Sequence, residues 1–268
     1  MKRVIGIIIV GLLIVSCGGE TQTKKNSNLN LQPIDHQWVD YASLLTDYVS
    51  EGLVDYKTMK ADRARVDALI STIASADISE VSKDRQLTFY INSYNIITLR
   101  SIVDAYPVKS IKDIDGVWKK KKWTVSGREV TLNELENDII REEFSEPRIH
   151  FALVCAAKGC PPLISVPYLG DILRQQLAKS GKQYVTNTKF NWIDTDNKTI
   201  GLSQLFEWYG EDFHEKYYIP ATLLTLCQED NASVNYILSH YPKDRQEALR
   251  AINFSVKYLK YDWSLNEK

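Results

Sequence analysis

Apolar side chains recur three or four residues apart in four stretches of the chain, which is the spacing of a helix face. Two stretches lie at 38–48 and 59–73, and another lies at 171–184. The longest follows Ser82, a residue suited to cap a helix, and continues to the residues before Pro107, which cannot extend a helix. These four segments are therefore predicted to be helices.

Two other stretches have the pattern of β-hairpins, with short strand-like runs on either side of turn residues. The first spans 123–130 and turns at Ser126-Gly127, and the second spans 191–202 and turns at Asp196-Asn197. Short helical patterns fill 220–252, and 254–263 is strand-like.

Two residues are placed to open further helices. Thr131 and Glu134 form a capping-box pattern, in which each side chain bonds the other's backbone N–H, and the helix that follows extends through Arg141. Ser203 is placed to cap a helix that carries several aromatic side chains.

The run 149–154 is apolar throughout except for His150, and it has the length of a strand. A continuous run of this kind predicts a strand covered on both faces. The predicted fold is thus mixed α/β of the α+β type: a single domain over 34–268, with a small central β-sheet packed by several helices. We find no internal repeat.

The first residues have the pattern of a secretory signal: Lys2-Arg3, a short apolar run, and small residues before Cys17. This pattern resembles bacterial lipoprotein signals. The resemblance implies a signal peptide at 1–16, acylation of Cys17, a flexible polar tether at 17–33, and attachment to membrane lipid without a spanning helix. The expected location is the bacterial cell envelope, on the outer membrane facing the periplasm; the alternative is an ordinary secretion signal with an incidental cysteine.

The charge balance argues against nucleic acid as a partner. The formal net charge is −1, and removal of Lys2 and Arg3 with the signal makes it more negative. The run Lys119 to Lys122 is an exception, and it is interpreted as a solvated strand edge, with an anionic lipid or polyanion contact as the alternative. The ligand is expected to be a small molecule, a peptide or a glycan.

The candidate chemistry lies in and after the run 149–154. His150, Cys155 and Cys160 are the proposed catalytic residues of a cysteine-hydrolase-like enzyme, because a thiolate attacks carbonyl carbon when a base or positive field ionises it. On a regular strand His150 and Cys155 would face opposite ways, so pairing with Cys160 across a folded loop is easier. A close approach of Cys155 and Cys160 requires the chain to turn between them, and Gly159 makes that turn feasible.

Two alternatives use the same side chains. A disulfide between Cys155 and Cys160 would remove the nucleophile and leave a non-catalytic binding or scaffold module. Zinc bound by His150 and both thiols would lack a fourth ligand, and no metal or cofactor is predicted. Cys227 is interpreted as a small buried hydrophobe.

Four further residues are candidates for binding. Asn92 and Asn95 share a helix face within an apolar segment, so they either bond nearby loop backbone or line the site. Glu136 and Arg141 lie on the helix opened by Thr131, where they are either solvated or in contact with the segment at His150.

Several motifs, taken together, resemble the family known as domain of unknown function 547, over about 38–266. They are Phe89-Tyr90-Ile91-Asn92-Ser93-Tyr94-Asn95, Pro147-Arg148-Ile149-His150-Phe151-Ala152-Leu153, Cys155, Cys160-Pro161-Pro162, Leu202-Ser203-Gln204-Leu205-Phe206-Glu207-Trp208-Tyr209 and Tyr261-Asp262-Trp263-Ser264-Leu265-Asn266.

The resemblance implies a protein that is often secreted or lipid-anchored in bacteria, and it carries no agreed activity. Glu136, Arg141 and His150 stand where the family pattern has the same residue types. Ala156 and Gly159 depart from the glycine and serine that often flank the two cysteines. A papain or transglutaminase arrangement is a fold-level analogy only, because the central helix has no cysteine.

Overall fold

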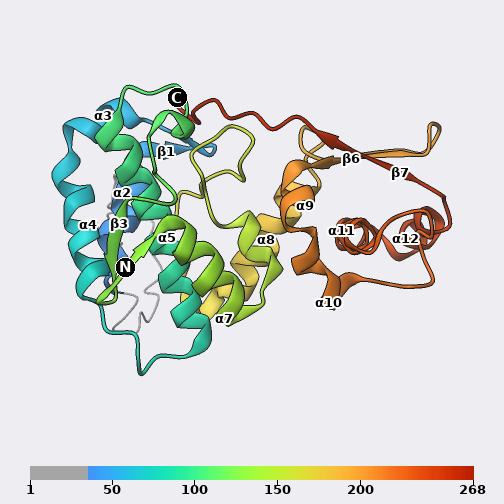
Figure 1. Cartoon of the computed structure of the whole chain (residues 1–268), viewed down its shortest axis with the longest axis horizontal. Coiled ribbons are helices and arrows are strands. Elements are labelled where there is room, and N and C mark those ends of the chain that lie inside the picture. Colours follow the sequence, from blue (N-terminus) through green and yellow to red (C-terminus); the bar gives the residue numbers. More distant parts are fainter. Residues whose placement is uncertain (1–35) are drawn as a thin grey trace, which may run out of the picture. The chain divides into compact units, whose positions relative to one another are not determined.

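Helix α5 (Lys83–Ala105) is the longest helix of the computed structural model, which describes residues 36–268. Every residue from Leu87 to Val103 is buried, so the helix is covered on all sides. It begins after Ser82, as predicted, although the serine side chain makes no capping bond, and it ends before Pro107. The described residues, 36–268, form one compact unit built around this helix (Figure 1).

Of the three helices near the start of the described chain, the second and third pack on α5, and the first packs on the other two. They are α2 (Val39–Tyr48), α3 (Tyr56–Ala61) and α4 (Arg63–Ser75). The apolar stripes read from the sequence are their buried faces, so the predicted helices at 38–48 and 59–73 are confirmed, with a break between α3 and α4 at Asp62.

The described strands form three small sheets, so the mixed α/β class is confirmed but the strands are not gathered in one central sheet. Both predicted hairpins are present, and the third strand of the last sheet is parallel to its neighbour. In Figure 1, β6 and β7 lie side by side, well apart from β1 and β3. The sheets are β1 (Val49–Ser50) with β2 (Leu53–Val54), β3 (Lys122–Val125) with β4 (Arg128–Thr131), and β5 (Trp192–Asp194) with β6 (Thr199–Ser203) and β7 (Ser255–Leu259).

The helices of the second half are mostly short. The capping box at Thr131 and the cap at Ser203 are both confirmed, because each hydroxyl accepts a backbone N–H of the helix it opens. The remaining α-helices are α6 (Leu132–Glu134), α7 (Glu142–Phe144), α8 (Leu173–Val185), α9 (Gln204–Tyr209), α10 (His214–Tyr217), α11 (Gln228–Leu238) and α12 (Lys243–Arg250). Shorter 3₁₀ turns occupy Ile111–Asp113, Gly170–Ile172 and Gly210–Phe213.

The prediction of a strand at 149–154 is wrong. Pro147–Phe151 forms a 3₁₀ helix whose first residue is a proline, where a missing N–H costs nothing. The backbone beyond it pairs with a side chain instead of a strand: Asn95 donates to the Ala152 carbonyl at 3.0 Å and accepts the Val154 N–H at 2.9 Å. These two bonds satisfy the groups that a neighbouring strand would otherwise have to satisfy.

The loop 155–160, which we call the thiol loop, is fastened to the C-terminal segment that follows β7. The N–H groups of Lys158 and Gly159 donate to the carbonyls of Ser264 and Asp262, each at 2.8 Å. A Cβ atom at Gly159 would lie 2.9 Å from the Asp262 nitrogen, so glycine is required there by close approach of the two backbones. This segment runs back from β7 across the molecule to the C-terminus (Figure 1).

The proposed signal, Cys17 and the tether through residue 33 lie outside the described residues. Within the described part of the chain, no helix has both the length and the apolar character that a membrane span requires.

Candidate functional site

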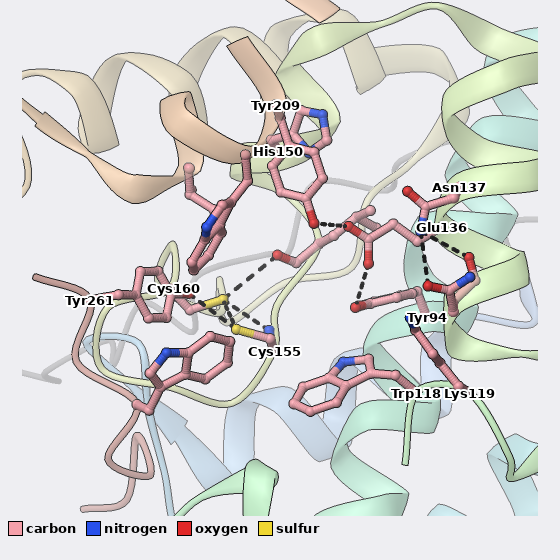
Figure 2. A pocket seen from close by; sticks show the side chains of 15 residues that line it. Tyr94, Trp118, Lys119, Glu136, Asn137, His150, Cys155, Cys160, Tyr209 and Tyr261 are labelled. Carbon is pink, nitrogen blue, oxygen red and sulfur yellow. Dashed lines mark hydrogen bonds between the residues drawn. The ribbon is translucent and has the colours of Figure 1, made fainter. Parts of the chain in front are cut away.

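A cavity of about 300 Å³ opens beside the thiol loop and is the centre of the candidate site (Figure 2). One side is a run of aromatic rings, which we call the aromatic wall: Trp118, Trp208, Tyr261 and Trp263. Neighbouring rings of this wall have centroids 4.7 to 6.1 Å apart, so they form one continuous surface. The cavity has the size and the largely apolar lining of a site for a small ligand.

Cys155 and Cys160 both line the cavity as free thiols. Their Sγ atoms lie 2.9 Å apart, which is beyond the roughly 2.05 Å of a disulfide bond. The Cys155 N–H donates to the Cys160 Sγ at 2.9 Å, and the Tyr261 hydroxyl lies 3.2 Å from the Cys155 Sγ. Cys160 is buried while Cys155 is partly exposed, so Cys155 is the thiol that a ligand can reach.

The surroundings of the two sulfurs separate their acidities. The hydrogen bond from Cys160 is the largest influence on Cys155, and together with bonds from Tyr261 and the Ala157 N–H it outweighs burial and lowers the pKa of Cys155. Burial is the largest influence on Cys160 and raises the pKa of that thiol. The two groups share a site in which only one can ionise readily, and Cys155 is the one that does.

A π-helical segment, Leu135–Arg141, supplies the polar side of the cavity. Such segments interrupt α-helices mostly as local bulges and often occur at functional sites. Glu136 lies at its start and accepts two hydroxyl hydrogen bonds, from Tyr94 at 2.8 Å and from Tyr209 at 2.9 Å. In Figure 2, Glu136 and Tyr94 lie on the right of the view and Tyr261 on the left, with the thiols between them and Tyr209 above.

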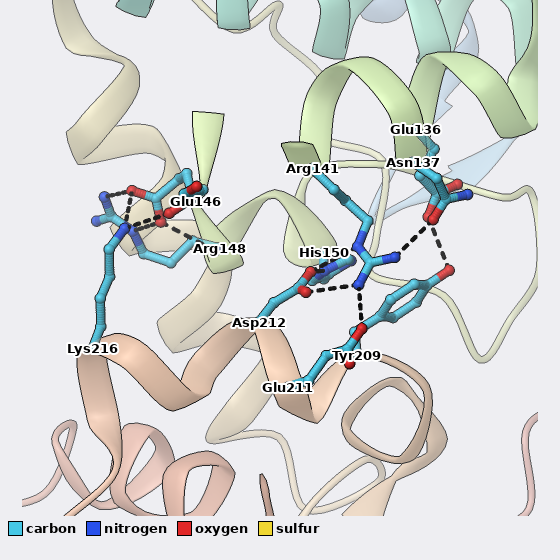
Figure 3. A network of polar contacts seen from close by, with 11 residues as sticks. Glu136, Asn137, Arg141, Glu146, Arg148, His150, Tyr209, Glu211, Asp212 and Lys216 are labelled. Carbon is cyan, nitrogen blue, oxygen red and sulfur yellow. Dashed lines mark hydrogen bonds and ion pairs between the residues drawn. The ribbon is translucent and has the colours of Figure 1, made fainter. Parts of the chain in front are cut away.

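Behind Tyr209, an ionic network joins Arg141 and His150 to Asp212, which is distant from both in the sequence (Figure 3). Arg141 donates two hydrogen bonds to the Asp212 carboxylate, from Nε at 2.8 Å and from Nη2 at 2.7 Å. The His150 Nε2 lies 2.6 Å from the Asp212 Oδ2, the oxygen that also accepts the hydrogen bond from the Arg141 Nε. The His150 ring stacks on Tyr209 with centroids 3.9 Å apart, so the network fixes the tyrosine that in turn holds Glu136.

The charges of the ionic network shift the pKa values of Asp212 and Arg141 in directions that keep both side chains ionised. Burial alone would raise the pKa of the Asp212 carboxyl, but hydrogen bonds from Arg141 and His150 outweigh it and hold this pKa well below its usual range. The same carboxylate is the main reason that the pKa of Arg141 is raised. Asp212 is therefore ionised across the physiological range and anchors both basic side chains.

The structure brings some of the sequence-predicted site residues together and not others. His150, Cys155, Cys160 and Glu136 all line the cavity. Among the hydrogen bonds of residues 36–268, however, none joins His150 to either sulfur, because its Nε2 is engaged by Asp212 and its ring face by Tyr209.

The other predicted binding residues serve the scaffold. Asn92 exchanges two hydrogen bonds with the Tyr168 backbone, and Asn95 does the same with the chain at Ala152 and Val154, so these buried amides bond loop backbone and do not line the cavity. Arg141 also lies outside the cavity lining, although it reaches the cavity indirectly through Asp212 and His150.

Three other sequence interpretations can be checked. Cys227 is exposed and not buried, because it stands at the start of α11 and caps it with its sulfur, so that interpretation is wrong. Among residues 36–268, no group of three or more histidine, cysteine or acidic side chains is arranged to hold a metal ion, which leaves the zinc alternative without support. In the lysine run, Lys120 and Lys121 pair with Asp115 and Asp104.

The residues that sequence reasoning missed are Asp212, Tyr94, Tyr209 and the aromatic wall. Tyr94, Tyr209, Trp208, Tyr261 and Trp263 stand inside the motifs that carry the family resemblance, and that was the available signal. Asp212 is 62 residues from His150 along the chain and stands in no recognised motif.

Comparison with known proteins locates one family within the chain. A search of curated proteins gives no match, and a search of solved structures gives none either. Residues 78–185, which include α5, the π-helical segment and both thiols, match the family model described as "Protein of unknown function, DUF547", so this part of the chain supports membership of that family.

Proposed function

We propose that the cavity is the active site of a cysteine-hydrolase-like enzyme in which Cys155 is the nucleophile. The observation that carries the proposal is the position of Cys155: its sulfur is accessible from a ligand-sized cavity and is surrounded by hydrogen-bond donors that lower its pKa. Reactive cysteines are found in such partly exposed settings, whereas inert structural cysteines are buried among apolar groups.

The chemistry that this arrangement supports is acyl transfer. The Cys155 thiolate would attack a carbonyl carbon of the ligand, forming a thioester and releasing the leaving group, which takes up a proton. Water would then hydrolyse the thioester and restore the thiol, so the net reaction consumes one water.

Two neighbours would assist Cys155 in different ways. Cys160, buried 2.9 Å away, keeps its proton and stabilises the thiolate by hydrogen bonding. His150 acts as a positioning residue and not as the base, because Asp212 holds its Nε2 and its ring supports Tyr209.

Acylation by p-nitrophenyl acetate tests the proposal. We expect acid-quenched protein to carry one acetyl group on Cys155, detected by peptide mass spectrometry, and a burst of p-nitrophenolate to accompany it. Cys155→Ser should lose both signals, whereas Cys227→Ser, which removes an exposed thiol distant in sequence, should keep them. Acetyl found only on Cys227, or on no cysteine, would exclude Cys155 as the nucleophile.

A second candidate function is a non-catalytic ligand-binding module, and the observation that favours it is the aromatic lining of the cavity. A binding module needs no thiolate, so its ligand should bind equally well to the wild type and to Cys155→Ser, and no covalent adduct should form. The acetylation experiment therefore separates the two candidates.

We also propose that the protein is a lipoprotein of the bacterial cell envelope, anchored through acylated Cys17 and facing the periplasm from the outer membrane. The signal-like pattern of the first residues supports this proposal. Globomycin, which blocks lipoprotein signal cleavage, should cause accumulation of a slower-migrating form of the full chain, and Cys17→Ala should show no such shift. An identical globomycin response in both proteins would contradict it.

A further inference from the structure

Within the described part of the chain, Glu136 has no cationic partner, unlike three other carboxylates close to the site. Asp212 and Glu211 are paired with Arg141, and Glu146 is paired with Arg148. Among the ion pairs of residues 36–268 none involves Glu136, whose two oxygens accept only the hydroxyls of Tyr94 and Tyr209. A partly buried carboxylate on the wall of a cavity thus lacks the counter-charge that such groups usually have.

The tyrosines hold this carboxylate in place without neutralising it. Each hydroxyl uses one oxygen, Tyr94 from helix α5 and Tyr209 from helix α9, so Glu136 is tied between two elements that are themselves packed. The stack of His150 on Tyr209 fixes the second of these hydroxyls. Fixed negative charge of this kind is available to a ligand without reorganisation of the protein.

The lining of the cavity includes one cationic side chain, Lys119, but its aromatic wall suits a cation that is weakly hydrated. Tryptophan and tyrosine faces attract a cation within about 6 Å of the ring through their quadrupoles, most strongly for tryptophan. The aromatic wall presents three tryptophans and Tyr261 to the cavity. The exposed Lys112 lies 5.1 Å from the Trp263 ring, so one ring of the wall already contacts a cation of this chain.

We propose that the cavity binds a small organic cation whose ammonium group carries alkyl substituents, with Glu136 and the aromatic wall as the recognition surface. An alkylated ammonium needs few hydrogen-bond acceptors and gains from aromatic faces, whereas a bare ammonium would lose hydration that this lining cannot replace. A cavity of about 300 Å³ suits a ligand of this size.

The inference rests on the proposed function and narrows its substrate to cationic esters or amides. With the cation beside Glu136, the remainder of the ligand extends toward the thiols, which lie between Glu136 and Tyr261 in Figure 2. The negative charge of Glu136 is one of the influences that raise the pKa of Cys155, against the hydrogen bond from Cys160, which lowers it. A bound cation would offset that charge and favour the thiolate.

Choline and its neutral carbon isostere, 3,3-dimethyl-1-butanol, provide a test on the wild-type protein. The two molecules differ by one nitrogen-for-carbon replacement, so their difference in binding measures recognition of the charge. Titration followed by tryptophan fluorescence should show that choline binds about ten-fold more tightly than the isostere. Equal affinities, or no saturable binding of choline up to about 10 mM, would overturn the inference.

Matched variants assign the effect to Glu136. Glu136→Gln should weaken choline binding about ten-fold and leave the isostere within about two-fold. Asp138→Asn removes an equal charge from an exposed position of the same helical segment and should change neither. Choline affinity unchanged by Glu136→Gln would overturn the assignment.

The same proteins keep this inference distinct from the proposed function. Cys155→Ser should still prefer choline over the isostere, because the recognition surface is intact. If Cys155 is not acetylated by p-nitrophenyl acetate while choline is still preferred, the nucleophile proposal fails and the cation site stands. If Cys155 is acetylated and choline is not preferred, the nucleophile proposal stands and the cation site fails.

Discussion

Replacing Asp212 by alanine is expected to lower the free energy of unfolding by about 3 kcal/mol, measured by urea denaturation. The carboxylate holds Arg141 by two bonds and His150 by one, and the His150 side chain is only 2% exposed. Loss of the Asp212 carboxylate leaves the buried His150 Nε2 without a partner and the Arg141 guanidinium with fewer partners. Truncating one member of a buried charged network typically costs a few kcal/mol.

Glu211→Ala is the matched control for this prediction. Glu211 is the neighbouring residue and also bonds Arg141, at 3.0 Å, but its side chain is 73% exposed. An exposed ion pair contributes at most about 1 kcal/mol, so the control should be close to the wild type. Similar small losses in the two variants would show that the network does not stabilise the fold.

The network also predicts a dependence of stability on pH. The pKa of Asp212 is lower in the folded protein than its unfolded value of about 3.9, so folding favours the ionised form. Its contribution is complete above about pH 4 and is lost as the pH falls toward the folded value. The wild type should therefore lose more stability below pH 4 than Asp212→Asn, which cannot titrate.

Replacing Cys160 by alanine is expected to slow alkylation of Cys155 by iodoacetamide at pH 7 by about ten-fold or more. The hydrogen bond from Cys160 is the largest influence lowering the pKa of Cys155, and a hydrogen bond to a charged group contributes about 1.5–3 kcal/mol. Without this bond, less of Cys155 is thiolate at neutral pH, and only the thiolate reacts.

The Cys160→Ser variant distinguishes loss of the hydrogen bond to Cys155 from the cavity that the alanine substitution creates. Serine is nearly as large as cysteine and still donates a hydrogen bond, so Cys155 should keep most of its reactivity in that variant. If alanine and serine slow the reaction equally, the hydrogen bond is not the cause. If alanine leaves the rate unchanged, Cys160 has no part in activating its neighbour.

The elements that could be predicted from the sequence are those determined by nearby residues. The hairpin around Ser126-Gly127, the capping box at Thr131 and the cap at Ser203 each depend on side chains within a few positions, and the structure contains all three. Helix α5 was predictable because its apolar positions extend over many turns before Pro107.

The strand predicted at 149–154 failed because its backbone partners are far away in the sequence. An apolar run of six residues does not by itself distinguish a buried strand from a buried turn. Here Asn95, on helix α5, satisfies the Ala152 carbonyl and the Val154 N–H, so the segment needs no neighbouring strand.

The candidate site was predicted only in part, because some of its contacts join residues that are distant in the sequence. The sequence indicated that Cys155 and Cys160 could meet only if the chain turned between them, and the folded loop brings their Sγ atoms to 2.9 Å. The partner of His150 did not follow, because Asp212 reaches it only through the packing of separate segments. The hypothesis of a histidine base thus gave way to a histidine that supports Tyr209.

The relative rates at which Cys155 and Cys227 react with iodoacetamide in the unreduced wild type test the central claim most directly. Cys227 is exposed, yet partial desolvation and the nearby acidic groups of Glu229 and Asp230 raise its pKa, whereas the pKa of Cys155 is lowered. Peptide-resolved mass spectrometry at pH 7 should show Cys155 alkylated first, despite its lower exposure. Faster labelling of Cys227, or an unlabelled Cys155, would contradict the account.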